Sequence, residues 1–232
     1  MTDFPIIASG RDSIVLDMGD GRVLRRFVGH AGAEDDADIM EYVRAYGYPV
    51  PAVHDAGGCD LIMDKIEGPT MSADLRRRPW MLKKHARALG LLHKELHRIP
   101  APTELKNPTG RGGSLLHMDL HPENVIMSPD GPAVIDWTNA CGGEAGLDVA
   151  MTWIILSTSA MPARGPKRTL EATGRALFLR HFLKAADPES WLHLGDAARL
   201  RLGDGNLTSE EKKVVAKVLE HKEVQALRDL HD

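Results

Sequence analysis

The stretch HMDLHPENVIMSPDGPAVIDW, residues 117–137, constrains this chain more than any other part of the sequence. Two short apolar runs, VIM and AVI, flank the segment Ser-Pro-Asp-Gly-Pro. Pro fixes one backbone angle, Asp bonds nearby backbone groups and Gly accepts a positive φ, so this segment predicts a tight turn between antiparallel strands. If the strands pair symmetrically about Asp130, Asn124 faces Asp136 with Cβ atoms roughly 5 Å apart. Amide and carboxylate oxygens suit a hard cation, so Asn124 and Asp136 are predicted ligands of Mg²⁺.

A loop with catalytic spacing comes directly before this hairpin. Asp119 lies five positions before Asn124, and His117 lies two positions before Asp119. This is the HxDxxxxN spacing of a phosphoryl-transfer loop, in which the Asp orients or accepts the proton of the attacking hydroxyl. We therefore expect Asp119 to be catalytic, in a transfer that depends mainly on positioning and charge neutralisation. His117 is interpreted as a structural residue of the loop, because Asp119 already fills the role of the base.

The residues HMDLHPENV resemble the HRDLKPEN loop of protein kinases. Together with the following IDW, they resemble more closely the HxDLHPxN loop of the aminoglycoside phosphotransferase and choline kinase family. A weaker likeness extends from residue 10 to residue 150 through VLRRF, YGYPVPAV and LLHKELHRIP. The resemblance implies an α+β, bilobal protein-kinase-like fold. Residues 1–67 would form an N-lobe with a small antiparallel β-sheet and one helix, and residues 68–232 a larger, mostly helical C-lobe that carries the catalytic-loop hairpin.

The same resemblance implies an O-phosphotransferase that uses ATP (or GTP) and Mg²⁺ and moves the γ-phosphate to a hydroxyl of a small molecule. Its expected partners are the nucleotide and a small hydroxylated acceptor. Arg25 in VLRRF stands where protein kinases carry the Lys that pairs with the phosphates, and Asp148 matches a family Asp that buttresses the catalytic loop. Glu34, Asp36 and Asp38 are candidates for the acid that pairs with Arg25. A pair between Arg25 and Asp36 can close bidentately.

The expected site residues fall into three groups. The catalytic residues are Asp119 and His121, the metal ligands are Asn124 and Asp136, and the residues expected to bind the nucleotide are Gly10, Ser13, Arg25, Asp36, Met63, Asp64 and Ile66. His121 replaces the Lys of HRDLKPEN and either faces the transferred phosphoryl group or has a packing role, and both interpretations stay open. Gly10 and Ser13 belong to the nucleotide loop SGRDS. The connection from Asp64 to Ile66 is expected to meet the adenine through backbone groups.

Periodicity and turn residues predict the secondary structure in outline. Strands are expected at 5–8, 13–18, 22–27 and 61–63, and helices at 33–47, from residue 72 to Pro100, at 146–160 and at 167–186. The cluster Gly-Asp-Gly at 19–21 is a hairpin signal. The run from Thr208 to Glu211 is typical of a capping box that begins a C-terminal helix.

Composition bears on partners and location. The net charge of -4 and the pI near 6.3 create no global field that would attract nucleic acid or an anionic membrane. The basic residues between Arg76 and Arg87 are interpreted as a solvated helical face, because no aromatic residues alternate with them. The most apolar stretch, VAMTWIILSTSAM, is shorter than the roughly 18 residues that a membrane span needs. With two distant cysteines and no basic N-terminal region, we expect a cytoplasmic protein, whose oligomeric state stays open.

Two functions outside the kinase class stay open. The cluster HMDLH contains two His and an Asp that could bind Zn²⁺ or Fe in a metallohydrolase. The second is a nucleotide-binding pseudokinase that serves as a partner module. Two features favour it: the nucleotide loop SGRDS contains only one Gly, and an Asp replaces the usual helix Glu. Protein-kinase activity is disfavoured, since only eleven residues separate Asp136 from Asp148. That interval leaves no room for a long segment that docks a peptide.

The acceptor is less determined than the reaction. Aminoglycosides or other antibiotics, choline-type compounds, sugars and nucleosides are all compatible with the sequence. From residue 151 onward, 13 Lys and Arg stand against 11 Asp and Glu, which does not favour a polycation. The carboxylates that could still bind one are Asp187, Glu189, Asp196 and Asp204.

Overall fold

The computed structural model describes residues 4–10, 12–29, 32–159, 165–186, 190–205 and 207–219. The chain divides into two compact units. The first joins Met1–Met71 to Glu123–Asn139, and the second joins Ser72–Pro122 to Ala140–Asp232. The chain therefore leaves the first unit after Met71, returns to it for the predicted hairpin, and leaves it again after Asn139.

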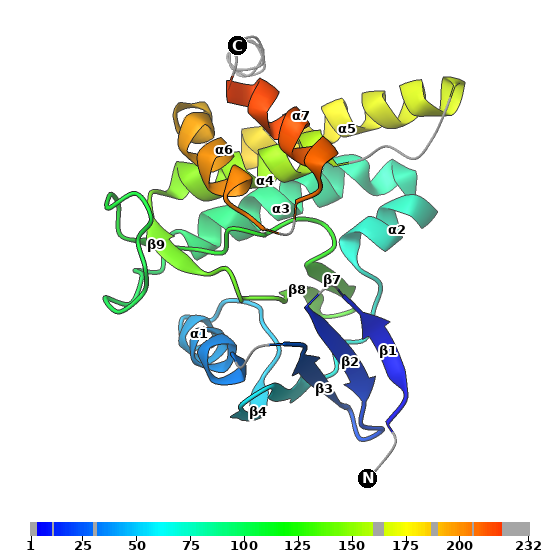
Figure 1. Ribbon diagram of the computed structural model, residues 1–232. Helices are drawn as coiled ribbons and strands as arrows, with labels where there is room; N and C mark the ends of the chain where they lie inside the picture. The colour runs from blue at the N-terminus through cyan, green and yellow to red at the C-terminus, as the bar shows by residue number, and fades with distance from the viewer. Residues whose placement is uncertain are drawn as a thin grey trace. The chain divides into compact units, whose positions relative to one another are not determined.

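An antiparallel sheet of five strands is the framework of the first unit (Figure 1). Its order is β1 (Ile6–Ser9), β2 (Ser13–Asp17), β3 (Arg22–Phe27), β5 (Asp60–Asp64) and β4 (Val53–Gly57). The hairpin between β2 and β3 turns at Gly19 and Gly21, both at φ 81°, a left-handed conformation that costs Gly little. Strand β4 forms where the sequence predicts only an extended segment, and the other four strands lie where the sequence predicts them.

Helix α1 (Ala33–Ala45) packs against β4 and β5 of this sheet. Its buried positions Asp36, Met40 and Val43 recur at helical spacing, so one stripe of the helix is covered. The first turn carries three acidic residues, which favour the positive end of the helix dipole. The helix therefore places one carboxylate, that of Asp36, among buried side chains.

A second antiparallel pair, β7 (Val125–Ser128) and β8 (Gly131–Val134), belongs to the first unit. Met127 N donates to Pro69 O at 2.8 Å. Gly68 packs so closely that an added Cβ would overlap with Met127 O. The hairpin belongs to the same compact unit as the five-stranded sheet, whereas the sequence assigns it to the second lobe. The predicted lobe boundary after residue 67 stays a prediction.

The turn of this hairpin is shorter than the symmetric turn that the sequence suggests. Ser128 pairs with Gly131, so the turn contains only Pro129 and Asp130. The Ser128 hydroxyl closes the turn, because it donates to Gly131 O at 2.8 Å and accepts from Asp130 N at 3.2 Å. A polar side chain thus fixes the two-residue turn.

This turn length changes the predicted pairing of the metal ligands. Ile135 N donates to Asn124 O at 3.1 Å, so Asn124 lies opposite Ile135. Asp136 follows one residue later, and the prediction that Asn124 directly faces Asp136 is wrong. A change of one residue in the turn shifts every pair of the ladder.

The second unit is mostly helical (Figure 1). Its helices are α2 (Met71–Arg77), α3 (Leu82–Leu96), α4 (Ala145–Thr158), α5 (Pro166–Ala185), α6 (Leu194–Leu202) and α7 (Ser209–Leu219), with short 3₁₀ turns at Pro79–Met81 and Ser190–His193. Helix α4 is buried from Gly146 to Ile155 and contacts α3, α5, α6 and α7. The helical pattern predicted from residue 72 onward is present, but a turn at Pro79–Met81 divides it into α2 and α3, and α3 ends at Leu96 and not at Pro100.

Two three-residue strands, β6 (Ser114–Leu116) and β9 (Cys141–Gly143), pair antiparallel in the second unit, and the sequence does not predict them. Strand β6 runs directly into His117, and β9 ends just before α4. The register pairs Leu116 with Cys141 and Ser114 with Gly143, so one short ladder connects the predicted catalytic loop to the segment that leads into α4, which carries Asp148.

Two expectations about the helices can be compared with the structure. The predicted capping box is confirmed, since Thr208 N donates to Glu211 Oε2 at 2.9 Å and Glu211 N donates to Thr208 Oγ1 at 3.2 Å. Among the described residues, no helix combines the length and the apolar character that crossing a membrane requires.

Candidate functional site

Arg25 is the centre of a buried polar cluster in the first unit. It lies in β3 and is 6% exposed. Its Nη1 donates to Asp36 Oδ2 of α1 at 2.9 Å, its Nη2 to Asp136 Oδ1 at 2.6 Å, and its Nε to Ser13 Oγ of β2 at 3.1 Å. The ring of Phe27 lies 4.5 Å from the guanidinium carbon. One planar cation with fixed donors thus ties the sheet to α1 and to the end of the hairpin.

Asp36 is the acid that pairs with Arg25 among the three that the sequence leaves open. It is buried, whereas Glu34 and Asp38 are exposed. Burial raises the pKa of Asp36 to about 6, while the Arg25 guanidinium opposes this rise and the Asp136 carboxylate adds to it. The Asp36 carboxyl is therefore held at a pKa close to neutral pH inside the cluster.

Asp136 gives one carboxylate oxygen to the cluster and keeps the other available. Oδ1 accepts from Arg25 and, at 3.2 Å, from the hydroxyl of Thr138. Oδ2 has no hydrogen bond or ion pair with any residue that the structure describes. Asp136 has φ 69°, a left-handed conformation that is uncommon outside Gly and marks a constrained position. The side chain is 39% exposed, so Oδ2 is accessible to a further ligand.

The groups at the ends of the hairpin fit Mg²⁺. The Asp136 carboxylate and the Asn124 amide supply oxygen atoms of the kind that this ion prefers. Within the described ranges, no group of three or more His, Cys, Asp and Glu side chains is placed to hold a metal ion. An ion held by Asp136 and Asn124 would therefore complete its shell with phosphate and water oxygens, as is usual at nucleotide sites.

The other predicted nucleotide residues also lie in the first unit. Gly10 N donates to Ser13 O at 2.8 Å across the hairpin between β1 and β2. Met63 is buried in β5, and Asp64 Oδ1 lies 2.7 Å from a His ring nitrogen of β4. The backbone N–H and C=O of Ile66 make no hydrogen bond to the part of the chain that the structure describes. A backbone donor and acceptor left open beside a strand end suit the edge of a purine base.

In the second unit, the carboxylate of Asp148 holds the start of the predicted catalytic loop, as the resemblance implies. Asp148 is fully buried in α4, where its Oδ2 accepts from His117 N at 3.1 Å and its Oδ1 from Met118 N at 2.7 Å. His97 Nε2 lies 3.0 Å from Oδ2. Burial favours a neutral Asp148, but the bond with His97 and the nearby imidazoles hold its pKa well below the usual range. These bonds keep Met118 at φ 63°, which is rare for a long side chain.

Asp119 follows in this loop and is partly accessible. Asp119 N donates to His117 Nδ1 at 3.3 Å, and His121 Nε2 lies 3.4 Å from Asp119 Oδ1. Burial favours a neutral Asp119, but the interactions with His121 and the charges of neighbouring basic groups outweigh it and lower the pKa of the carboxyl. The side chain is 23% exposed. Asp119 is therefore an ionised, reachable carboxylate at neutral pH.

A buried hydrogen-bond chain supports the loop at Leu120. Thr152 Oγ1 donates to Leu120 O at 2.9 Å and lies 3.0 Å from His93 Nε2. His93 Nδ1 donates to Leu89 O at 2.9 Å, because a carbonyl oxygen can only accept. Burial lowers the pKa of His93 to about 4, so its ring is neutral at neutral pH. A neutral ring with its proton on Nδ1 accepts at Nε2, and the single hydroxyl proton of Thr152 is then shared between His93 and the loop.

All the predicted site residues lie in described segments, but they fall in different units. The first unit contains the nucleotide and metal candidates Gly10, Ser13, Arg25, Asp36, Met63, Asp64, Ile66, Asn124 and Asp136, and the second contains Asp119 and His121. The sequence misses Thr138, which lies two residues after Asp136, and Thr152, which lies four residues after Asp148 on α4. Thr152 lies one helical turn from Asp148 and so on the same face of α4, which is the signal that could have identified it, whereas no periodic pattern marks Thr138.

The four carboxylates considered for a cationic acceptor are less available than the sequence suggests. Asp187 and Glu189 lie outside the described residues. Asp196 and Asp204 each accept from Arg side chains at 2.7 to 3.0 Å. Their charges are therefore already balanced within the second unit.

One segment of the chain, which contains the predicted catalytic loop, the hairpin and α4, matches a known protein family. Residues 104–192 match the model of the phosphotransferase enzyme family. The chain resembles a phosphotransferase. The resemblance predicted from HMDLHPENV and IDW is thus confirmed. Over 61 residues the chain is also 36% identical to a thiamine kinase of Escherichia coli (strain SMS-3-5 / SECEC), a match that covers 26% of this chain and 20% of that kinase.

Solved phosphotransferase structures match over nearly the whole chain. A choline/ethanolamine kinase family protein from Mesorhizobium loti has a TM-score of 0.63 at 12% identity, with 98% of this chain and 92% of that chain covered. Aminoglycoside phosphotransferase APH(4)-Ia, in a ternary complex with AMP-PNP and hygromycin B, has a TM-score of 0.60 at 16% identity, with 99% and 94% covered. The predicted α+β, protein-kinase-like fold class is therefore confirmed.

Proposed function

We propose that this protein is a Mg²⁺-dependent O-phosphotransferase that moves the γ-phosphate of ATP, or of GTP, to a hydroxyl group of a small molecule. The observation that carries the proposal is the placement of Arg25 between Asp36 and Asp136. The Arg25 guanidinium binds one carboxylate oxygen of Asp136 and leaves the other oxygen open to a cation. Phosphoryl transfer needs this combination of a fixed cation for the phosphates and an oxygen ligand for the metal. AMP-PNP in the similar phosphotransferase supports a nucleotide of this kind.

Each group then has a role in the reaction. Asp119 orients the acceptor hydroxyl and takes its proton. Arg25 pairs with the phosphates, and the open backbone groups of Ile66 bind the base. Asn124 and Asp136 would hold Mg²⁺, which when bound neutralises charge on the phosphate oxygens.

His121 keeps the Asp119 carboxylate ionised through its ring nitrogen at 3.4 Å. We assign it this electrostatic role rather than direct catalysis. A carboxylate with a lowered pKa is a weak general base, so its main contribution is to orient the hydroxyl.

The proposed acceptor is a small alcohol. The eleven residues between Asp136 and Asp148 include β9, which is paired with β6, so this interval offers no long segment for a peptide substrate. The local identity to a thiamine kinase supports an alcohol of that size. A polycationic aminoglycoside is less favoured, because the described acids Asp196 and Asp204 are already paired with Arg side chains.

The test is a screen for ADP release over hydroxylated compounds, with thiamine and choline first, then sugars, nucleosides and aminoglycosides. The Asp119→Ala variant is the blank. The Asp130→Ala variant is the matched control, because Asp130 is an exposed acid at the tip of the adjacent hairpin. We expect Mg²⁺-dependent ADP release with at least one acceptor from the wild type and from Asp130→Ala.

Removal of the proposed base should lower that rate by roughly 10² to 10⁴-fold in Asp119→Ala without loss of the fold. Equal rates in the folded Asp119→Ala variant would reject the assignment of Asp119. ATP binding without turnover for every acceptor would instead favour the pseudokinase interpretation.

A further inference from the structure

Helices α3 and α5 of the second unit carry a concentrated positive charge. Together they contain nine Lys and Arg but only two Glu. The whole chain has 29 Lys and Arg against 33 Asp and Glu. These two neighbouring helices therefore carry a local excess of positive charge in a chain whose net charge is -4, and the proposed phosphotransfer does not use them.

The two helices run parallel and approach closely at one Gly. Leu82 of α3 lies near Gly174 of α5, and Gly90 lies beside Phe182 O and Ala185 further along. An added Cβ at Gly90 would lie 2.7 Å from both Phe182 O and the Ala185 Cβ, so only Gly permits this approach. The longer side chains on either side of this contact therefore lie along the boundary between the two helices, which we call the seam.

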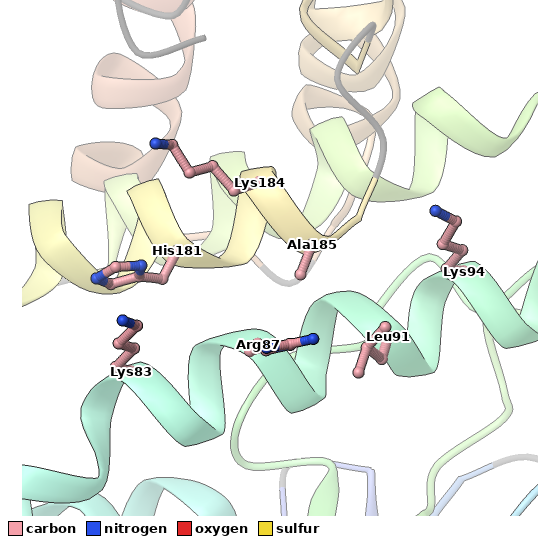
Figure 2. Close-up of a pocket in the computed structure, with 7 residues that line it drawn as sticks. All are labelled: Lys83, Arg87, Leu91, Lys94, His181, Lys184 and Ala185. Atoms are coloured by element: carbon pink, nitrogen blue, oxygen red, sulfur yellow. The ribbon is translucent and has the colours of Figure 1, made fainter.

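A groove of about 370 Å³ follows this seam (Figure 2). It is lined by Lys83, Arg87, Leu91 and Lys94 of α3 and by His181, Lys184 and Ala185 of α5. In Figure 2 the side chains of Lys83 and Lys94 point from α3 in the direction of α5, and the side chain of Ala185 points toward α3. No carboxylate from the described part of the chain lines the groove. Among the described residues, none of its Lys and Arg side chains has an ion-pair partner.

We propose that this groove, the α3–α5 groove, binds an acidic peptide segment of a partner protein. Lys83 and Lys94 are eleven residues apart on one helix, which corresponds to a span of about 16 Å. An extended peptide covers that span with about five residues. Leu91, which is 40% exposed, lies between Arg87 and Lys94 and offers an apolar contact within that span. The fitting segment therefore carries acids toward both ends and an apolar residue between them.

Other anions fit this groove less well. A compact phosphate ligand cannot reach cations that are distributed over three helical turns. A single-stranded nucleic acid usually stacks its bases on Phe, Tyr or Trp side chains, and none of the described residues that line the groove is of these types. The spaced, unpaired cations instead complement the regular spacing of carboxylates along a peptide.

The test is fluorescence anisotropy of a labelled peptide, Asp-Glu-Leu-Glu-Asp, with the full chain at low salt. The charge-reversal variant is Arg87→Glu with Lys94→Glu. Its matched control is Lys84→Glu with Arg180→Glu, which makes the same change of charge on exposed side chains of the same helices outside the groove. If the double charge-reversal variant does not fold, the single variant Lys94→Gln takes its place in the binding measurement.

We expect the groove variant to weaken peptide binding by about tenfold or more and the control to change it by less than about twofold. Phosphotransfer by both variants should match the wild type, so this result is separable from the proposed function. Equal weakening by both variants would overturn the proposal. Tighter binding of tripolyphosphate or of a single-stranded oligonucleotide, lost in the groove variant, would also overturn it.

Discussion

The Nη2 atom of Arg25 lies 2.6 Å from Oδ1 of Asp136, which is 111 residues further along the chain. The same guanidinium donates to Asp36 of α1 through its other terminal nitrogen. One Arg side chain therefore links the sheet to a helix acid and to the acid that we propose as a metal ligand. Replacing it affects both the fold of the first unit and the proposed nucleotide site.

Arg25→Lys should weaken the binding of Mg²⁺ with ATP by about tenfold or more, because a point charge on a flexible stem cannot reproduce a planar fork of donors. The matched control is Arg26→Lys, the next residue of β3, whose exposed side chain pairs with Asp60 at 2.6 Å. Exposed ion pairs of this kind contribute at most about 1 kcal/mol to the free energy of unfolding. Calorimetric titration of both variants measures the difference. Equal affinities in the two variants would contradict the role of Arg25.

The raised pKa of Asp36 predicts a pH-dependent stability. Its folded value of about 6 exceeds the ordinary value of 3.8, so the folded chain holds more protons than the unfolded chain within this window. The contribution of Asp36 to the free energy of unfolding therefore falls as the pH rises through the window. From about pH 4 to about pH 7, the difference between wild type and Asp36→Asn should fall by roughly 1 to 3 kcal/mol. Urea unfolding at the two pH values checks this, and a constant difference would be the contrary result.

The sign is opposite for His93. Its folded pKa of about 4 lies below the ordinary 6.5, so the folded chain holds fewer protons in this window. The stability from neutral His93 is complete above about pH 6.5 and is lost as the pH falls through the folded value. Wild type should lose up to roughly 3 kcal/mol more than His93→Gln between about pH 7 and pH 4. A pH profile in His93→Gln that matches the wild type would refute the prediction.

Asp148→Asn should disturb the catalytic loop more than the fold. The Asn side chain has one acceptor oxygen, so one of the amides of His117 and Met118 is left without its partner. The expected loss is about 1 to 3 kcal/mol of unfolding free energy. The rate of phosphotransfer should fall well beyond what the loss of folded protein explains. Asp130→Asn, at the exposed hairpin tip, should leave both quantities near the wild-type values, and wild-type rates in folded Asp148→Asn would contradict the role of Asp148.

The sequence predicts the outline of the site because its key residues lie in local patterns. The turn residues identify the hairpin, and the HxDxxxxN spacing identifies the loop. The helical period also distinguishes Asp36 from Asp38 as the partner of Arg25, because Asp36 shares a buried stripe with Met40 and Val43.

What the sequence does not predict depends on short or long-range contacts. The strands β6 and β9 have three residues each, too few for a period to appear. The register of the hairpin depends on whether its turn holds two or three residues, and the Ser128 hydroxyl decides this. The link from Arg25 to Asp136 joins distant parts of the chain, so no local pattern contains it.

The most direct test follows the γ-phosphate itself. With ATP labelled at that phosphate, Mg²⁺ and the acceptor identified by ADP release, the wild type should transfer the label to the acceptor as a phosphate ester. Folded Asp119→Asn should transfer little or none. Label that appears as inorganic phosphate, or transfer by Asp119→Asn at the wild-type rate, would contradict a phosphotransferase whose loop carboxylate directs an alcohol.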